Sequence, residues 1–163
     1  MIRRLTPADA PLLRNLRLLA LTDSPDAFGS TLEETRKRSL SDWEWMLRSE
    51  GNPYFVFEDD TPHRGLIGAL RPDENGTAHL VSMWVAPSLR GCGVSDDLVR
   101  HVIAWVQDYD TRRLKLSCTE GNKNAENLYL RHGFERTGET ETRERDGMIE
   151  FGMALSLTRA SSL

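Results

Sequence analysis

A short segment in the middle of the chain has the residue types of an anion-binding loop. An apolar run at residues 80–85 predicts a buried strand before it, and apolar residues at helical spacing predict a helix after it, ending near Tyr109. The first amides of a helix lack partners within the helix, and its dipole favours negative charge there. Glycines let a bulky anion approach the backbone, and an arginine adds positive charge. A phosphate or pyrophosphate site is therefore predicted at Arg90, Gly91, Cys92, Gly93, Val94 and Ser95.

Two well-known phosphate loops do not fit this segment. No Lys-Ser or Lys-Thr pair follows the glycines, which excludes a P-loop, and Asp96 stands where a dinucleotide fingerprint needs its third glycine. Glycines at a strand-to-helix turn can also serve packing alone. A second motif, at residues 122–134, supports the anion-binding interpretation through the resemblance that the two segments share.

The second motif has the pattern Asn-x-x-Ala-x-x-Leu-Tyr-x-x-x-Gly-Phe, formed by Asn122, Ala125, Leu128, Tyr129, Gly133 and Phe134. Together with the loop, it resembles the GCN5-related N-acetyltransferase (GNAT) family, the acyl-CoA-dependent N-acyltransferases. Arg90 and Gly93 match the family's Arg/Gln-x-x-Gly-x-Gly/Ala loop, and the order and spacing of the two motifs fit over most of the chain. Ser95 departs from the family, which usually has glycine or alanine there. Serine is still small, keeps its amide and can offer its hydroxyl to a phosphate.

The resemblance implies an α/β (α+β) fold with a mixed, mostly antiparallel central sheet, splayed at the cofactor site and covered by helices on both faces. The residue patterns agree, because early antiparallel strands precede strand-helix-strand-helix units. Strands are predicted at residues 2–5, 54–58, 66–71, 78–85, 114–118, 134–142 and 148–155, and helices at 7–22, 41–49, 94–109 and 122–132. Ser41 to Glu44 predicts a capping box for the second helix. Of Trp43 and Trp45, only one can face the core of this short helix, and the other is expected at a cleft or an interface.

Length and composition narrow the class of protein. At 163 residues, the chain is most simply one domain, residues 1–163, with a loose tail at 159–163. Its net charge of −4 argues against nucleic acid as a partner. No apolar stretch could span a bilayer and the N-terminus lacks a secretory hydrophobic region, so a cytoplasmic protein with no membrane partner is expected. Cys92 and Cys118 are expected to be reduced thiols, and cysteine–histidine spacing suggests no metal site.

The resemblance also implies how acetyl-CoA is bound. Its pyrophosphate would lie on the loop, and its pantetheine arm would pair like an added strand with the backbone of Met83, Trp84 and Val85. The amide near Val85 could then stabilise charge that develops on the thioester oxygen. Asn122 matches a family position that contacts the pantetheine or acyl region, and it could equally be the N-cap of its helix. Asn127 is a further candidate for cofactor contact, with a solvated helix residue as the alternative.

Tyr129 is the candidate general acid. When an amine displaces CoA, the leaving thiolate needs a proton or a hydrogen bond, and a tyrosine hydroxyl at the sulfur can supply either. The alternative is a core aromatic residue that packs with Leu128 and Phe134.

The acceptor amine also needs a base, since an alkylamine with a pKa of ~10.4 is almost wholly protonated at neutral pH. Glu33, Glu34 and Glu120 are candidates, and each could instead be a surface carboxylate. His79 lies on the central strand, where a structural histidine is the more usual interpretation.

We therefore expect an N-acetyltransferase that moves acetyl from acetyl-CoA to a primary amine by direct attack in a ternary complex, without a cysteine carrier. The acceptor is an amine-bearing small molecule or a peptide or protein amine, and the acidic candidates favour a cationic small molecule. The alternative from another class is a non-catalytic acyl-CoA-binding sensor or interaction module. A longer-chain or succinyl donor is an alternative within the enzyme class, and a cationic wall near the acyl site would favour succinyl. A homodimer could form through the edge of the final hairpin, although its charges are typical of a protected edge.

Overall fold

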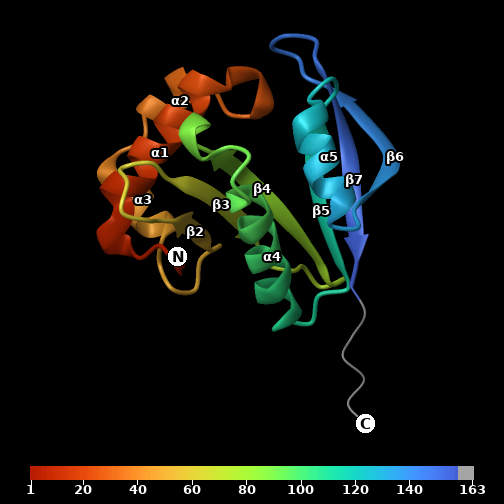
Figure 1. The fold of residues 1–163 in the computed structure, drawn as a ribbon, viewed down its shortest axis with the longest axis horizontal. Helices are drawn as coiled ribbons and strands as arrows, with labels where there is room; N and C mark the ends of the chain where they lie inside the picture. Colours follow the sequence, from red (N-terminus) through yellow and green to blue (C-terminus); the bar gives the residue numbers. More distant parts are fainter. Residues whose placement is uncertain (158–163) are drawn as a thin grey trace.

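The computed structural model describes residues 1–157, and these residues form one sheet of seven strands with helices packed against it (Figure 1). The strands are β1 (Ile2–Arg4), β2 (Tyr54–Phe57), β3 (Gly65–Leu70), β4 (Thr77–Val85), β5 (Arg113–Thr119), β6 (Glu135–Thr142) and β7 (Ile149–Ser156). The α-helices are α1 (Ala10–Asp23), α2 (Leu32–Arg36), α3 (Leu40–Met46), α4 (Val94–Gln107) and α5 (Lys123–Arg131). The predicted mixed α/β fold is confirmed, and the predicted tail at 159–163 lies outside the described residues.

The sheet opens at its centre, between β4 and β5. Its strands follow the order β1-β2-β3-β4-β5-β7-β6, and every neighbouring pair is antiparallel except β4 with β5. These two strands pair only from Thr77 opposite Arg113 to His79 opposite Lys115, and they then diverge (Figure 1). The predicted splay of a mostly antiparallel sheet is therefore confirmed.

A bulge in β4 lies just beyond its last pair with β5. The register between β3 and β4 shifts between Leu66 and Gly68, and Ser82 of β4 has a φ of +57°. A non-glycine residue in this left-handed conformation costs roughly 1–2 kcal/mol. Bulges bend a strand and increase its twist, so this one marks the place where β4 departs from β5.

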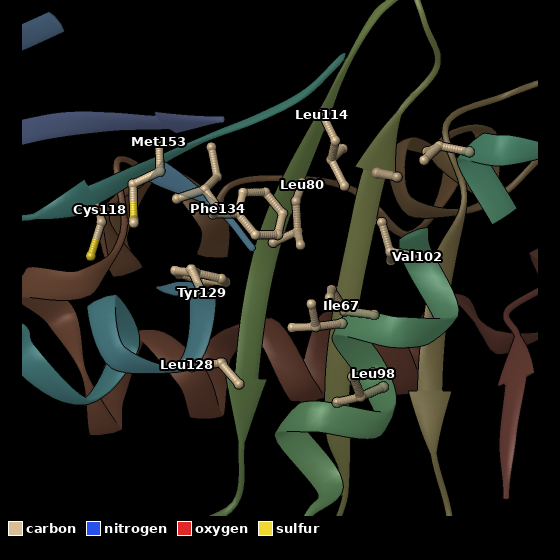
Figure 2. Packing of buried hydrophobic residues seen from close by; sticks show 14 of the residues in the cluster. Ile67, Leu80, Leu98, Val102, Leu114, Cys118, Leu128, Tyr129, Phe134 and Met153 are labelled. Atoms are coloured by element: carbon tan, nitrogen blue, oxygen red, sulfur yellow. The ribbon is translucent and has the colours of Figure 1, made fainter. Parts of the chain in front are cut away.

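Alternate residues of the central strands belong to two hydrophobic clusters on opposite faces of the sheet. Ile67 and Val85 belong to the cluster under α4 and α5, whereas Leu66 and Trp84 belong to the cluster under α1 and α3. Figure 2 shows the first cluster, with Leu98 and Val102 of α4 beside Ile67, and Tyr129, Phe134 and Met153 further along. The predicted arrangement of helices on both faces follows from this alternation.

The helices near the N-terminus correct the sequence prediction in detail. α3 begins at Leu40, and its capping box is formed by Ser39 and Asp42 rather than by Ser41 and Glu44. The amide of Asp42 donates to Ser39 Oγ at 3.2 Å, and the amide of Ser39 donates to the Asp42 carboxylate at 2.9 Å. Aspartate thus closes the box two residues earlier than the glutamate pattern suggested.

Further differences lie around this helix. The short helix α2, capped by Thr31, was not predicted, and a 3₁₀ turn at Pro7–Asp9 precedes α1. Trp43 is buried in the core, with 1% of its surface exposed, whereas Trp45 is 65% exposed and stacks under the guanidinium of Arg48. Trp45 lines neither of the two cavities described below.

β6 is one edge of the sheet, since it pairs only with β7. Its register with β7 is interrupted between Arg136 and Thr140, and Gly138 within this break has a φ of +87°. Nearly all of its side chains are exposed. The edge is therefore polar and irregular rather than flat and apolar.

Candidate active site

The loop between β4 and α4 presents a run of backbone amides at a helix N-terminus. Gly91 and Gly93 have φ values of +79° and +84°, which residues other than glycine rarely adopt. The helix α4 begins directly afterwards at Val94. In the part of the chain that the structure describes, the amides of residues 91–96 donate no hydrogen bond. Free amides at the positive end of a helix dipole fit a phosphate or pyrophosphate.

Arg90 is fixed beside these amides by two contacts. Its Nε donates to the carbonyl of Val85 at 3.0 Å, and its Nη2 forms an ion pair with Asp23 at the end of α1. Asp23 also accepts a hydrogen bond from Trp84 Nε1 at 3.0 Å, and the bonds from Trp84 and Arg90 lower the pKa of the Asp23 carboxyl. The loop is thereby tied to both β4 and α1.

A cavity of about 680 Å³ lies in the opening between β4 and β5, a volume typical of small-molecule sites. The predicted cofactor-binding residues that line it are Met83, Trp84, Val85, Arg90, Gly91, Ser95, Asn122 and Asn127. Cys92, Gly93 and Val94 do not line it, although the amides of all three are free as described above. The structure thus brings the loop, β4 and α5 together around one space, which we call the larger cavity.

Tyr129 lines the larger cavity from α5, opposite the end of β5. Its ring packs edge-on against Phe134 at 5.7 Å between centroids, and Figure 2 shows it near Cys118. Only 6% of the residue is exposed, and its hydroxyl has no hydrogen-bond partner among residues 1–157. Burial and then the neighbouring Cys118 raise the pKa of Tyr129, so the hydroxyl keeps its proton at neutral pH. It is thus a core aromatic residue that also lines the cavity.

The two cysteines do not offer a nucleophile in this cavity. Burial raises the pKa of Cys118 to about 11, so its thiol stays protonated at neutral pH. Cys92 is exposed in the loop and does not line the cavity.

The two asparagines of α5 differ in their surroundings. Asn122 is the N-cap of the helix, because its Oδ1 accepts from the amide of Ala125 at 3.3 Å, and it also lines the larger cavity. Asn127 is exposed and lines the same cavity. The two interpretations of Asn122 are thus compatible in one side chain.

Asp96 joins the start of α4 to the end of α5. Its carboxylate accepts from Arg131 at 2.8 and 3.1 Å and contacts His132 Nε2 at 2.7 Å. The hydrogen bond from Arg131, followed by that from His132, lowers the pKa of Asp96 to about 2. This contact holds the helix that carries Tyr129 against the helix whose N-terminus forms the loop.

The three glutamates predicted as base candidates lie outside both cavities. Glu33 is exposed and paired with Lys37 at 3.6 Å, and Glu34 takes part in the cap of α2. Glu120 pairs with Arg136 at 3.1 Å. Each of these glutamates therefore has a structural or surface contact that explains why a carboxylate stands at its position.

A smaller cavity of about 360 Å³ adjoins the larger one, since Ala27, Phe28, Ser117 and Thr119 line both. Its polar lining includes Arg17, His79, Ser82 and Glu150. Burial lowers the pKa of His79, which favours the neutral imidazole, and Glu150 lies 3.4 Å from Arg143 Nη1. The sequence does not predict a role for Arg17, Ser82 or Glu150, because they belong to no motif and come from three separate elements.

These features define the class of the protein. Residues 16–134 match the model of the Acetyltransferase (GNAT) family, and the chain belongs to this family. The resemblance seen in the loop and in the second motif is thereby confirmed. No match was found among proteins of curated function.

Solved structures of other acetyltransferases have the same fold. A ribosomal-protein-alanine N-acetyltransferase from Brucella melitensis is 24% identical, with a TM-score of 0.76 over 96% of this chain and 99% of the other. A putative acetyltransferase from Salmonella typhimurium, solved with its cofactor acetyl-CoA, is 19% identical, with a TM-score of 0.78 over 100% and 96%. Spermidine N-acetyltransferase from Vibrio cholerae, in complex with CoA and spermine, is 16% identical, with a TM-score of 0.78 over 98% and 96%. At these identities the likeness shows the fold.

Within residues 1–157, no group of three or more histidine, cysteine or acidic side chains could hold a metal ion. Over the same residues, every helix is too short or too polar to cross a membrane.

Proposed function

We propose that this chain is an N-acetyltransferase that moves an acetyl group from acetyl-CoA to a primary amine by direct attack in a ternary complex. The observation that carries the proposal is the position of Tyr129, whose hydroxyl has no partner among the described residues and which lines the cavity that begins at the free amides. The acetyl-CoA bound in the Salmonella typhimurium structure and the amine acceptors named for its relatives support the donor and the reaction class.

The chain's own groups divide the binding of the donor between them. The amides of residues 91–95, with Arg90, bind the pyrophosphate, and the unpaired edge of β4 at Met83 to Val85 accepts the pantetheine arm in the manner of an added strand. Asn122 and Asn127 line the same path from α5. When bound, acetyl-CoA supplies the activated thioester and a thiol leaving group.

The transfer needs one proton donor and one proton acceptor. The amine nitrogen forms a bond to the carbonyl carbon while the carbon–sulfur bond breaks, the electron pair stays on sulfur, and Tyr129 donates a proton to it. The nitrogen loses a proton in exchange, and freeing its lone pair from the ammonium form at neutral pH costs about 4–5 kcal/mol. Of the side chains that could accept this proton, His79 and Glu150 line the smaller cavity, from which an amine would approach.

The test is thiol release from acetyl-CoA with a panel of amines, comparing the wild type with Tyr129→Phe. Loss of the acid is expected to lower kcat about 100-fold, whereas the Kd for acetyl-CoA stays within about twofold because the ring remains in place. Tyr109→Phe, at an exposed tyrosine that lines neither cavity, is the control. Unchanged activity in Tyr129→Phe would remove the acid assignment. Tight acetyl-CoA binding without turnover on any amine would favour the sensor alternative.

A further inference from the structure

Arg17 of α1 stands at the bulge of β4, inside the smaller cavity. Its Nη1 donates to Ser82 Oγ at 3.2 Å, and its guanidinium lies 5.5 Å from the centre of the Phe28 ring. Both of these residues also line the cavity, and Phe28 lies on the boundary with the larger one. The guanidinium therefore lies near the place where donor and acceptor would meet.

Arg17 has no counterion in the described part of the chain, residues 1–157: no carboxylate lies within ion-pair distance of it. Burial lowers the pKa of Arg17, Tyr54 opposes this shift, and the positive charge of Arg38 adds to it. The Arg38 guanidinium donates to Met46 Sδ and lies over the Trp43 ring. A half-buried cation without a counterion is costly, and a bound anion would relieve that cost.

We propose that Arg17 binds a carboxylate of the substrate, and that the acceptor is a small amine with a carboxylate close to its reactive nitrogen, as in an α-amino acid. This inference rests on the proposed function and names its substrate class. A guanidinium offers two parallel N–H donors that match the two oxygens of a carboxylate. The cavity of about 360 Å³ is at the small end of the range for ligand sites.

The other polar residues of the cavity fit the amine end of such a molecule. Glu150 supplies a carboxylate whose charge is shared with Arg143, and His79 supplies a neutral imidazole. A polyamine, by contrast, would bring only positive charge to Arg17. The acidic residues that favoured a cationic acceptor in the sequence, Glu33, Glu34 and Glu120, do not line this cavity.

A carboxylate could also come from the donor, if the acyl group were succinyl. Arg17 lines the smaller cavity and is not among the residues that line the larger one, where the donor would bind. This placement favours the acceptor as the source. In both cases a carboxylate would bind to Arg17, and the experiment below distinguishes the acceptor from a succinyl donor as its source.

The experiment uses sets of three amines with a common side chain, such as L-leucine, L-leucinamide and 3-methylbutylamine, for several side chains. The initial rate of thiol release from acetyl-CoA and calorimetric binding to CoA-saturated protein are measured for wild type, Arg17→Gln, Arg17→Lys and the control Arg14→Gln. Arg14 is an exposed arginine on the same helix. A parallel series compares acetyl-CoA with succinyl-CoA on the best amine.

For at least one side chain, we expect the amino acid to have a kcat/KM and a binding affinity at least tenfold higher than those of its amide and its amine. Arg17→Gln should erase this preference by raising KM, with kcat within twofold and a melting temperature no lower than that of the wild type, because an unpaired cation has been removed. Arg17→Lys should keep part of the preference, and Arg14→Gln all of it.

Equal use of the three compounds for every side chain, or a preference that survives in Arg17→Gln, would overturn the proposal. A preference for succinyl-CoA that Arg17→Gln removes would retain the carboxylate site and overturn its assignment to the acceptor. Calorimetric preference for the amino acid without any turnover would support the role of Arg17 and contradict the proposed function instead, so the two failures are distinguishable.

Discussion

The two cavities at the opening of the sheet are lined by different kinds of chemical group. The larger one combines main-chain groups, namely the free amides of one short loop and the unpaired edge of β4, with side chains of two contiguous motifs. The smaller one depends on side chains from elements far apart in the sequence, including Arg17 of α1, His79 of β4 and Glu150 of β7. Backbone donors keep their chemistry when side chains change, whereas the second set can be altered one residue at a time. The proposed donor site therefore depends less on the identity of its side chains than the proposed acceptor site does.

The largest effect that would separate the cavities is expected from Arg90→Ala. Removing a charged hydrogen-bond donor and leaving the Asp23 carboxylate beside the loop should raise the Kd for acetyl-CoA roughly 10- to 30-fold, since each tenfold corresponds to about 1.4 kcal/mol. The KM of the acceptor should hardly change, the reverse of Arg17→Gln. Calorimetry measures the Kd for acetyl-CoA, and steady-state kinetics measure the KM of the acceptor.

Adding Asp23→Asn to Arg90→Ala is the control for that interpretation. If repulsion from Asp23 contributes, the double variant should recover part of the lost affinity. Loss of affinity for both substrates in Arg90→Ala would mean that the two cavities are not independent.

A smaller effect is expected at the glycines of the two regions. Gly93→Ala places a side chain at a φ of +84°, at a cost of roughly 1.5 kcal/mol, and should lower the melting temperature by about 3–6 °C. Gly29 lines the smaller cavity, has no positive φ and has open space around the position of a Cβ. Gly29→Ala should therefore leave the melting temperature within about 2 °C, and an equal loss in both variants, measured by thermal unfolding, would contradict the distinction.

The smallest effect is expected where the two helices of the larger cavity are joined. Asp96→Asn should lower the free energy of unfolding by about 0.5–1 kcal/mol, because Arg131 and His132 lose a charged acceptor. Asp97→Asn, at the next residue, removes only an exposed pair with Arg100 and should have almost no effect. Urea unfolding measures both.

The pH dependence of this difference has a defined sign. The folded pKa of Asp96 is lowered to about 2 by its bond to Arg131, below the ordinary value of about 3.9. Its contribution is therefore fully present above about pH 5 and is lost as the pH falls towards 2. The stability difference between wild type and Asp96→Asn should shrink over that interval, and a difference that grows on acidification would contradict the assignment.

The contrast between the cavities also explains what the sequence could predict. Arg90, Gly93, Asn122 and Tyr129 lie in two contiguous motifs, and the resemblance of these motifs to the GNAT family predicts that they form one site. The alternation along β3 and β4 and the helical spacing of α4 likewise indicated the sheet and its covering helix.

Residues that meet only through tertiary structure could not be found in this way. Arg17 and Ser82 are 65 positions apart, and they meet because β4 bulges at Ser82 while α1 packs across the sheet. Glu33, Glu34 and Glu120 were candidates for their charge, and local contacts on the surface account for that charge in the structure. The cap of α3 was misplaced for a local reason, since Ser39 and Ser41 offer competing boxes and the aspartate at position 42 serves the first.

The irregular edge at β6 has a consequence for the behaviour of the protein in concentrated solution. A flat strand with open amides and carbonyls is a template on which further chains can stack, and such stacking leads to aggregation. Charged side chains at Glu135, Arg136, Glu139 and Glu141, with a break around Gly138, make that stacking unfavourable. The open sheet that creates the two cavities thus ends on a strand that discourages other chains from extending it.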